Sequence, residues 1–107
     1  MTTADRDTQH ANIAAIHAAA TKLELTPAIN AEDDGYVCAT WSKRMVRLGL
    51  PTGDIHVITF FSPGSTQPQH EVILFDFEAN LTVESMPAVL VALEEAQSLL
   101  GRVAEAL

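Results

Sequence analysis

The chain has 107 residues, 48% of them hydrophobic and 19% charged, and its formal net charge is −8 at pH 7. A chain of this length and composition is expected to fold as one globular domain without disulfides or a structural metal ion. The negative charge disfavours binding of nucleic acid through a basic face, because phosphate contacts need clustered Lys and Arg.

The compartment expected from the sequence is the cytoplasm. Cys38 is the only cysteine, so neither an intrachain disulfide nor a Cys-rich zinc site is expected. The polar first residues are not followed by the apolar segment of a signal peptide. The longest apolar stretch, residues 86–93, is far shorter than the roughly 20 residues that span a bilayer, so no membrane association is expected.

The N-terminal third predicts a tail and one helix. Residues 1–8 are expected to form a flexible tail, and residues 9–107 the folded domain. A helix is predicted over residues 9–23, since its apolar residues recur at helical spacing: Ile13, Ile16, Ala20 and Leu23. Pro27 ends this helix, and the polar residues that follow it predict a turn up to Gly35.

The middle of the chain predicts strands separated by short turns. The expected strands cover residues 36–41, 45–50, 56–62 and 70–79. Between them lie a short connection at residues 42–44, a Pro-Thr-Gly-Asp hairpin turn at 51–54 and a polar loop at 63–69. Connections this short favour an antiparallel meander.

A long helix is predicted over residues 85–107, with Ser85 as its N-cap and Pro87 in its first turn. The element order is therefore α-β-β-β-β-α. This order predicts a two-layer α+β fold, with a four-stranded antiparallel meander sheet and with the N-terminal and the long C-terminal helix on one of its faces.

The last two predicted strands carry more apolar residues than one covered sheet face requires. Their outer face, and the far end of the last helix, are expected to expose an interface for another protein: Val57, Phe61, Val72, Leu74, Leu99, Val103 and Leu107. The simplest partner is a second copy in a symmetric dimer. The alternative is that the central strand is covered on both faces by the chain itself.

Half of the basic residues cluster beside the only tryptophan. Lys43, Arg44 and Arg47 follow Trp41, and basic groups next to an indole are able to bind a phosphate, a nucleotide or an acidic helix. The alternative interpretation is a solvated hairpin turn whose charges protect the edge of the sheet.

No residue is predicted to be catalytic or to bind a metal ion, and no cofactor is expected. His10 and His17 are about 10.5 Å apart along a helix, too far to share one ion. His56 and His70 begin adjacent antiparallel strands, which places them at opposite ends. Neither a nucleophile elbow nor a glycine-rich phosphate loop occurs.

These observations favour a non-catalytic protein-interaction module, of the adaptor, chaperone or inhibitor kind, that acts as a homodimer. The alternative is a small-ligand or nucleotide-binding domain that uses the cluster around Trp41. An enzyme is the least favoured of the three classes.

Overall fold

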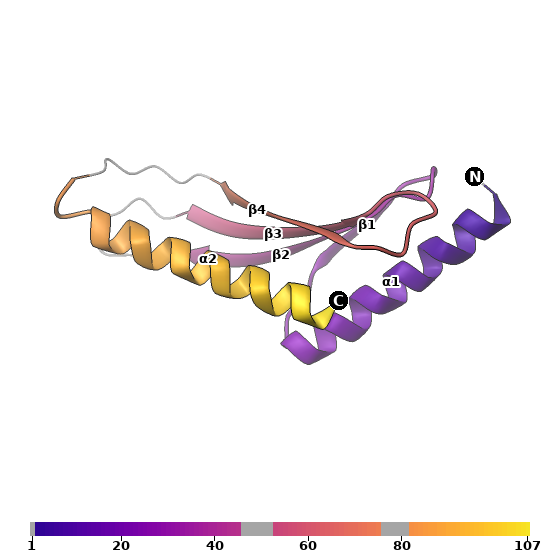
Figure 1. The fold of residues 1–107 in the computed structure, drawn as a ribbon, viewed down its shortest axis with the longest axis horizontal. Coiled ribbons are helices and arrows are strands. Elements are labelled where there is room, and N and C mark those ends of the chain that lie inside the picture. Colours follow the sequence, from indigo (N-terminus) through magenta and orange to yellow (C-terminus); the bar gives the residue numbers. More distant parts are fainter. Residues whose placement is uncertain (1, 46–52, 76–81) are drawn as a thin grey trace.

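The computed structural model describes residues 2–45, 53–75 and 82–107. Its elements are α1 (Thr3–Leu23), β1 (Ala28–Ala31), β2 (Val37–Met45), β3 (Gly53–Phe61), β4 (Gln69–Phe75) and α2 (Met86–Ala106). The strands form one antiparallel sheet in the order β1-β2-β3-β4. Both helices lie on the same side of this sheet (Figure 1). The α+β class and the order α-β-β-β-β-α predicted from the sequence are therefore confirmed.

Helix α1 begins at Thr3, six residues before its predicted start at residue 9 and within the segment expected to form a tail. Thr2 is the N-cap: its side chain accepts a hydrogen bond from the backbone N–H of Asp5 (3.1 Å), and the Asp5 carboxylate accepts one from the N–H of Thr2 (3.4 Å). This reciprocal pair is a capping box, which satisfies two backbone donors at the start of a helix. The helix ends at Leu23, as predicted.

The sheet contains four strands, but two of the expected strands are placed differently. Residues 28–31, expected in a turn, form β1 and pair with β2. β2 continues through residues 42–44, where a connection was expected, up to Met45. The rest of the strand predicted over residues 45–50 lies outside the described residues. β4 starts one residue before its predicted start, and the loop between β3 and β4 lies where it was predicted. β3 starts at Gly53, three residues earlier than predicted and within the turn expected at residues 51–54.

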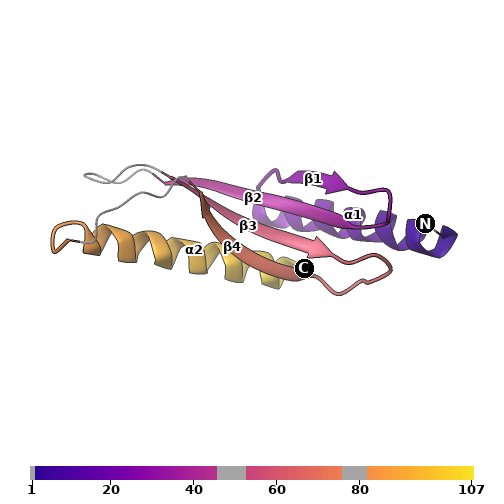
Figure 2. The same ribbon diagram turned by 90° about the horizontal axis from the view of Figure 1, so that it is seen from above.

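The core lies between the sheet and the two helices. Trp41 of β2 pairs with Val57 of β3, which pairs in turn with Val72 of β4, so these residues share the inner face. The inner face also buries Val37, Ala39, Thr59 and Phe61. α2 packs on β3 and β4, α1 packs on β2, and the two helices contact each other (Figure 2).

Two buried polar side chains attach α1 to neighbouring loops. Gln9 Nε2 donates to the carbonyl of Glu32 (2.8 Å), and Asn12 Nδ2 donates to the carbonyl of Ser65 (2.9 Å). Gln9 and Asn12 lie on the buried stripe of α1 that continues with Ile16, Ala19 and Leu23. Apolar periodicity alone did not detect them, because this stripe begins with amides.

Candidate interaction surface

Large exposed apolar side chains gather at the beginning of α2. Among the side chains of residues 2–42, 56–73 and 82–107, the large hydrophobic ones with clear exposure are Val83 (90% exposed), Met86 (39%), Leu90 (53%), Val91 (44%) and Leu93 (46%). Four of them follow one another at spacings of three and four residues. We call these four, Val83, Met86, Leu90 and Leu93, the α2 apolar stripe.

The stripe is separate from the face that anchors α2 in the core. The anchoring residues also follow three- and four-residue spacing: Val89, Ala92, Ala96, Leu99 and Val103. At 3.6 residues per turn, the two sets are about 110° apart around the helix axis. Val91 is exposed on a third side, turned about 100° from its neighbour Leu90. α2 therefore has one apolar face for its own core and a second one that is open to solvent.

A local turn fixes the start of α2. The N–H of Thr82 donates to the Ser85 hydroxyl (2.9 Å), and the N–H of Ser85 donates to the Thr82 hydroxyl (3.2 Å). Ser85 is the N-cap, and Pro87 lies in the first turn, both as predicted. Proline is tolerated there because the first N–H groups of a helix have no partner within the helix. Val83 lies within this turn, between Thr82 and Ser85.

The stripe is also uncharged. No charged residue lies between Glu84 and Glu94, although the chain carries a net charge of −8. The part of α2 after Leu93 differs, because it carries Glu94, Glu95, Arg102 and Glu105. An exposed surface that is both apolar and uncharged is typical of a protein-binding site.

The interface residues predicted from the sequence lie elsewhere, and this prediction is corrected. Val57 is on the inner face because its register partner is the buried Trp41. The second half of α2 packs in the core through Leu99 and Val103, and the large exposed apolar side chains lie on its first half. Four of the predicted residues are buried: Val57, Phe61, Leu99 and Val103. Val72 and Leu107 are half-buried against the core, and Leu74 pairs with Ile55 within the sheet.

The outer face of β3 carries the side chains that alternate with those predicted to lie there. Of the described elements, none covers this face (Figure 2). It carries Ile58 and Phe60, which alternate with Val57 and Phe61, and the rings of Phe60 and Tyr36 stack with centroids 6.3 Å apart. Burial, and then the negative charges of Cys38, Glu71 and Glu32, raise the pKa of Tyr36. Tyr36, Ile58 and Phe60 are only partly exposed.

Trp41, the aromatic residue of the predicted ligand site, is not accessible to a ligand. Trp41 is completely buried, and its indole N–H donates to the Thr59 hydroxyl at 3.1 Å. It is therefore not able to stack on a ligand, and the prediction that it binds one is corrected. Lys43 and Arg44 lie in β2 opposite Ile55 and Asp54. Arg47 lies outside the described residues.

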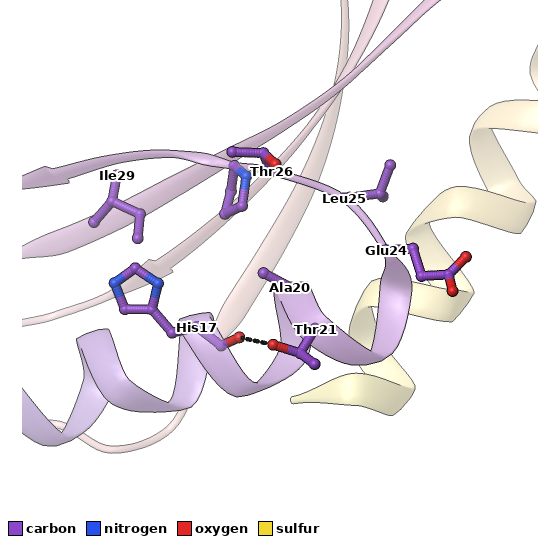
Figure 3. A pocket seen from close by; sticks show the side chains of 8 residues that line it. His17, Ala20, Thr21, Glu24, Leu25, Thr26 and Ile29 are labelled. Carbon is purple, nitrogen blue, oxygen red and sulfur yellow. Dashed lines mark hydrogen bonds between the residues drawn. The ribbon is translucent and has the colours of Figure 1, made fainter.

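A groove that the sequence did not predict lies at the end of α1 (Figure 3). Its volume is about 430 Å³, and residues of α1 and of the segment leading into β1 line it, among them His17, Thr21, Leu25 and Ile29. The Thr21 hydroxyl donates to the carbonyl of His17 (3.2 Å), so its proton is already used in a hydrogen bond within the helix. An open groove without converging polar groups lacks the features of a small-molecule site.

Other classes of site find no support in the part of the chain that the structure describes. There, no group of three or more His, Cys, Asp and Glu side chains is arranged to hold a metal ion. No helix among these residues has both the length and the hydropathy to cross a bilayer. Comparison with known proteins finds no matching family model, no matching curated protein and no matching solved structure.

Proposed function

We propose that this protein is a non-catalytic interaction module that binds another protein through the α2 apolar stripe. The observation that carries the proposal is the second, exposed apolar face of α2, formed by residues 83–93 of a strongly acidic chain. The adaptor, chaperone and inhibitor classes expected from the sequence all work through such a surface. The residues differ from those expected, but the kind of surface is the same.

The energetics support association. Burial of apolar surface contributes roughly 25 cal/mol per Å², so covering side chains such as Met86, Leu90 and Leu93 would contribute several kcal/mol before the cost of association. α2 does not need these residues for its own packing, because Val89, Ala92 and Ala96 already anchor its first half. A helix face that contacts only solvent usually carries polar or charged side chains, not three large apolar ones.

Site-specific photo-crosslinking in the source cells tests this proposal. A photoreactive amino acid at position 90 is expected to give a covalent adduct with a protein, either another chain or a second copy. Adding Leu93→Glu should remove the adduct, because a charge within the contact disfavours burial. The matched control carries the photoreactive group at position 104, which is exposed on the second half of α2. A folded variant that forms no adduct from position 90, or forms it equally from position 104, would refute the proposal.

A further inference from the structure

We infer that the partner of the α2 apolar stripe is a second copy of this chain, bound with the two α2 helices antiparallel about a two-fold axis near Leu90. This inference rests on the proposed function and names its partner. Three observations support it: the spacing of the stripe, the distribution of charge along α2, and the position of the stripe within the molecule.

The spacing suits a symmetric helix pair. Val83, Met86, Leu90 and Leu93 are separated by three, four and three residues, the repeat by which two helices pack along a common seam. When two such helices run antiparallel with Leu90 at the axis, residues whose numbers sum to 180 lie level, so Met86 of each copy lies within one residue of Leu93 of the other. The next position, Gln97, then faces Val83. The stripe is therefore complementary to itself, as a two-fold interface requires.

The charges favour the antiparallel arrangement over the parallel one. In the antiparallel pair, Glu94 of each copy reaches the first turn of the other α2. That turn contains no acidic residue, and the N-terminal end of a helix carries a partial positive charge that stabilises a carboxylate. In a parallel pair, Glu94 would lie level with Glu94 of the other copy, far from the start of either helix, and would not gain this stabilisation.

The shape of the molecule keeps the two acidic bodies apart. The chain measures 55 × 24 × 18 Å, and its radius of gyration is 16.2 Å, compared with about 13 Å for a compact domain of this length. The start of α2 lies at one end of the long axis (Figure 1). Antiparallel pairing at this end directs the rest of each copy in opposite directions.

A lipid surface fits the stripe less well than a second copy. Amphipathic helices that bind membranes carry Lys and Arg beside their apolar face. α2 contains Arg102 as its single basic residue, against Glu94, Glu95 and Glu105. An anionic membrane would repel this helix.

Sedimentation equilibrium of the full chain tests the inference. At about 100 μM the wild-type protein is expected to sediment at twice the monomer mass of 11.5 kDa. Leu90→Glu should raise the dissociation constant by at least about tenfold. Val91→Glu is the matched control: Val91 is also exposed on α2 but points away from the seam, so this variant should remain dimeric. Thermal unfolding of both variants checks that each of them is folded.

Cysteine cross-linking tests the antiparallel register in a Cys38→Ser background. Leu90→Cys is expected to cross-link to itself, because the two-fold axis brings both copies of this position together, whereas Val91→Cys is not. Met86→Cys mixed with Leu93→Cys should give the mixed cross-link in preference to either self-cross-link. Preferred self-cross-links from both Met86→Cys and Leu93→Cys would overturn the antiparallel arrangement.

The outcomes separate the two proposals. A wild-type protein that stays monomeric at about 100 μM, or a dimer that Leu90→Glu leaves intact, overturns the inference that α2 pairs with a second copy. If position 90 nevertheless photo-crosslinks to a different protein in cells, the proposed function stands with another partner. If the chain is monomeric and position 90 gives no adduct, both proposals fail.

Discussion

The hydroxyl of Thr59 on β3 lies 2.9 Å from Nδ1 of His70 on β4. The same oxygen accepts the indole N–H of Trp41, which comes from β2 on the other side. An indole nitrogen only donates, so Thr59 still has its proton and a second lone pair to share with His70, and the tautomer of His70 decides which of the two donates. This chain of hydrogen bonds crosses three strands of the inner face.

Thr59→Val is expected to lower the free energy of unfolding by about 1–3 kcal/mol, because it leaves the buried N–H of Trp41 without an acceptor. Valine keeps the shape of the side chain, so the loss reports the hydrogen bonds. Urea denaturation measures it. Thr40→Val is the matched control, since Thr40 lies on the outer face of β2 and should change stability by less than about 0.5 kcal/mol. Equal effects of the two substitutions would contradict this account.

The free energy of unfolding should decrease when the pH is lowered, because His70 takes up a proton more readily in the unfolded chain. Burial lowers the pKa of His70 from its ordinary value of 6.5. Below 6.5 the unfolded chain therefore binds a proton more readily than the folded chain, so the free energy of unfolding decreases as the pH falls towards the pKa of the folded state. The contribution is fully present above about pH 7.5.

Urea denaturation at about pH 7.5 and about pH 5.5 measures this dependence. His70→Gln should lose less stability between the two pH values than the wild-type protein, because the other titrating groups are common to both. His17→Gln, a substitution on the exposed surface of α1, should behave like the wild-type protein. A wild-type pH dependence retained in His70→Gln would show that His70 is not its source.

Strong periodicity and clear turn residues predicted much of the fold. Ser85, Pro87 and the long apolar repeat placed α2 within one residue at each end, and the polar loop between β3 and β4 was also placed correctly. β1 was not predicted because Ala28–Ala31 contains a single β-branched residue, Ile29. Polar residues 42–44 indicated a turn, but pairing with β3 extends β2 through them.

The sequence predicted an exposed apolar surface, but on other residues than those that the structure exposes. The sequence predicted an exposed apolar interface at the far end of the last helix, whereas the structure exposes large apolar side chains at its beginning. Which end is exposed depends on where α1 and the sheet contact α2, and no local pattern encodes these contacts. For the same reason the inner face of β3 was assigned wrongly: Val57 and Ile58 are equally apolar, and the register opposite Trp41 decides between them.

Removal of the N-terminal cap should destabilise the domain. Thr2→Ala removes the acceptor for the Asp5 N–H and is expected to lower the free energy of unfolding by about 1 kcal/mol. Amide exchange in the first turn of α1 should also become faster. Thr3→Ala is the control, because Thr3 is exposed at the first helical position and makes no part of the capping box. If residues 1–8 were a tail, both substitutions would leave stability unchanged.

Substitution by alanine should lower the stability of the protein at Gly64 and raise it at Gly101. Gly64 adopts φ +75°, and a Cβ there would lie 3.1 Å from Oδ1 of Asp5, the residue that closes the capping box. Gly64→Ala is therefore expected to cost about 1 kcal/mol or more, and to weaken the cap as well. Gly101 lies within α2 with nothing within 4 Å of the added Cβ, so Gly101→Ala should raise stability by roughly 0.5–1 kcal/mol. Urea denaturation of both variants measures the two effects side by side. A Gly64→Ala variant that is as stable as the wild-type protein, or more stable, would show that the left-handed turn at Gly64 does not form in solution.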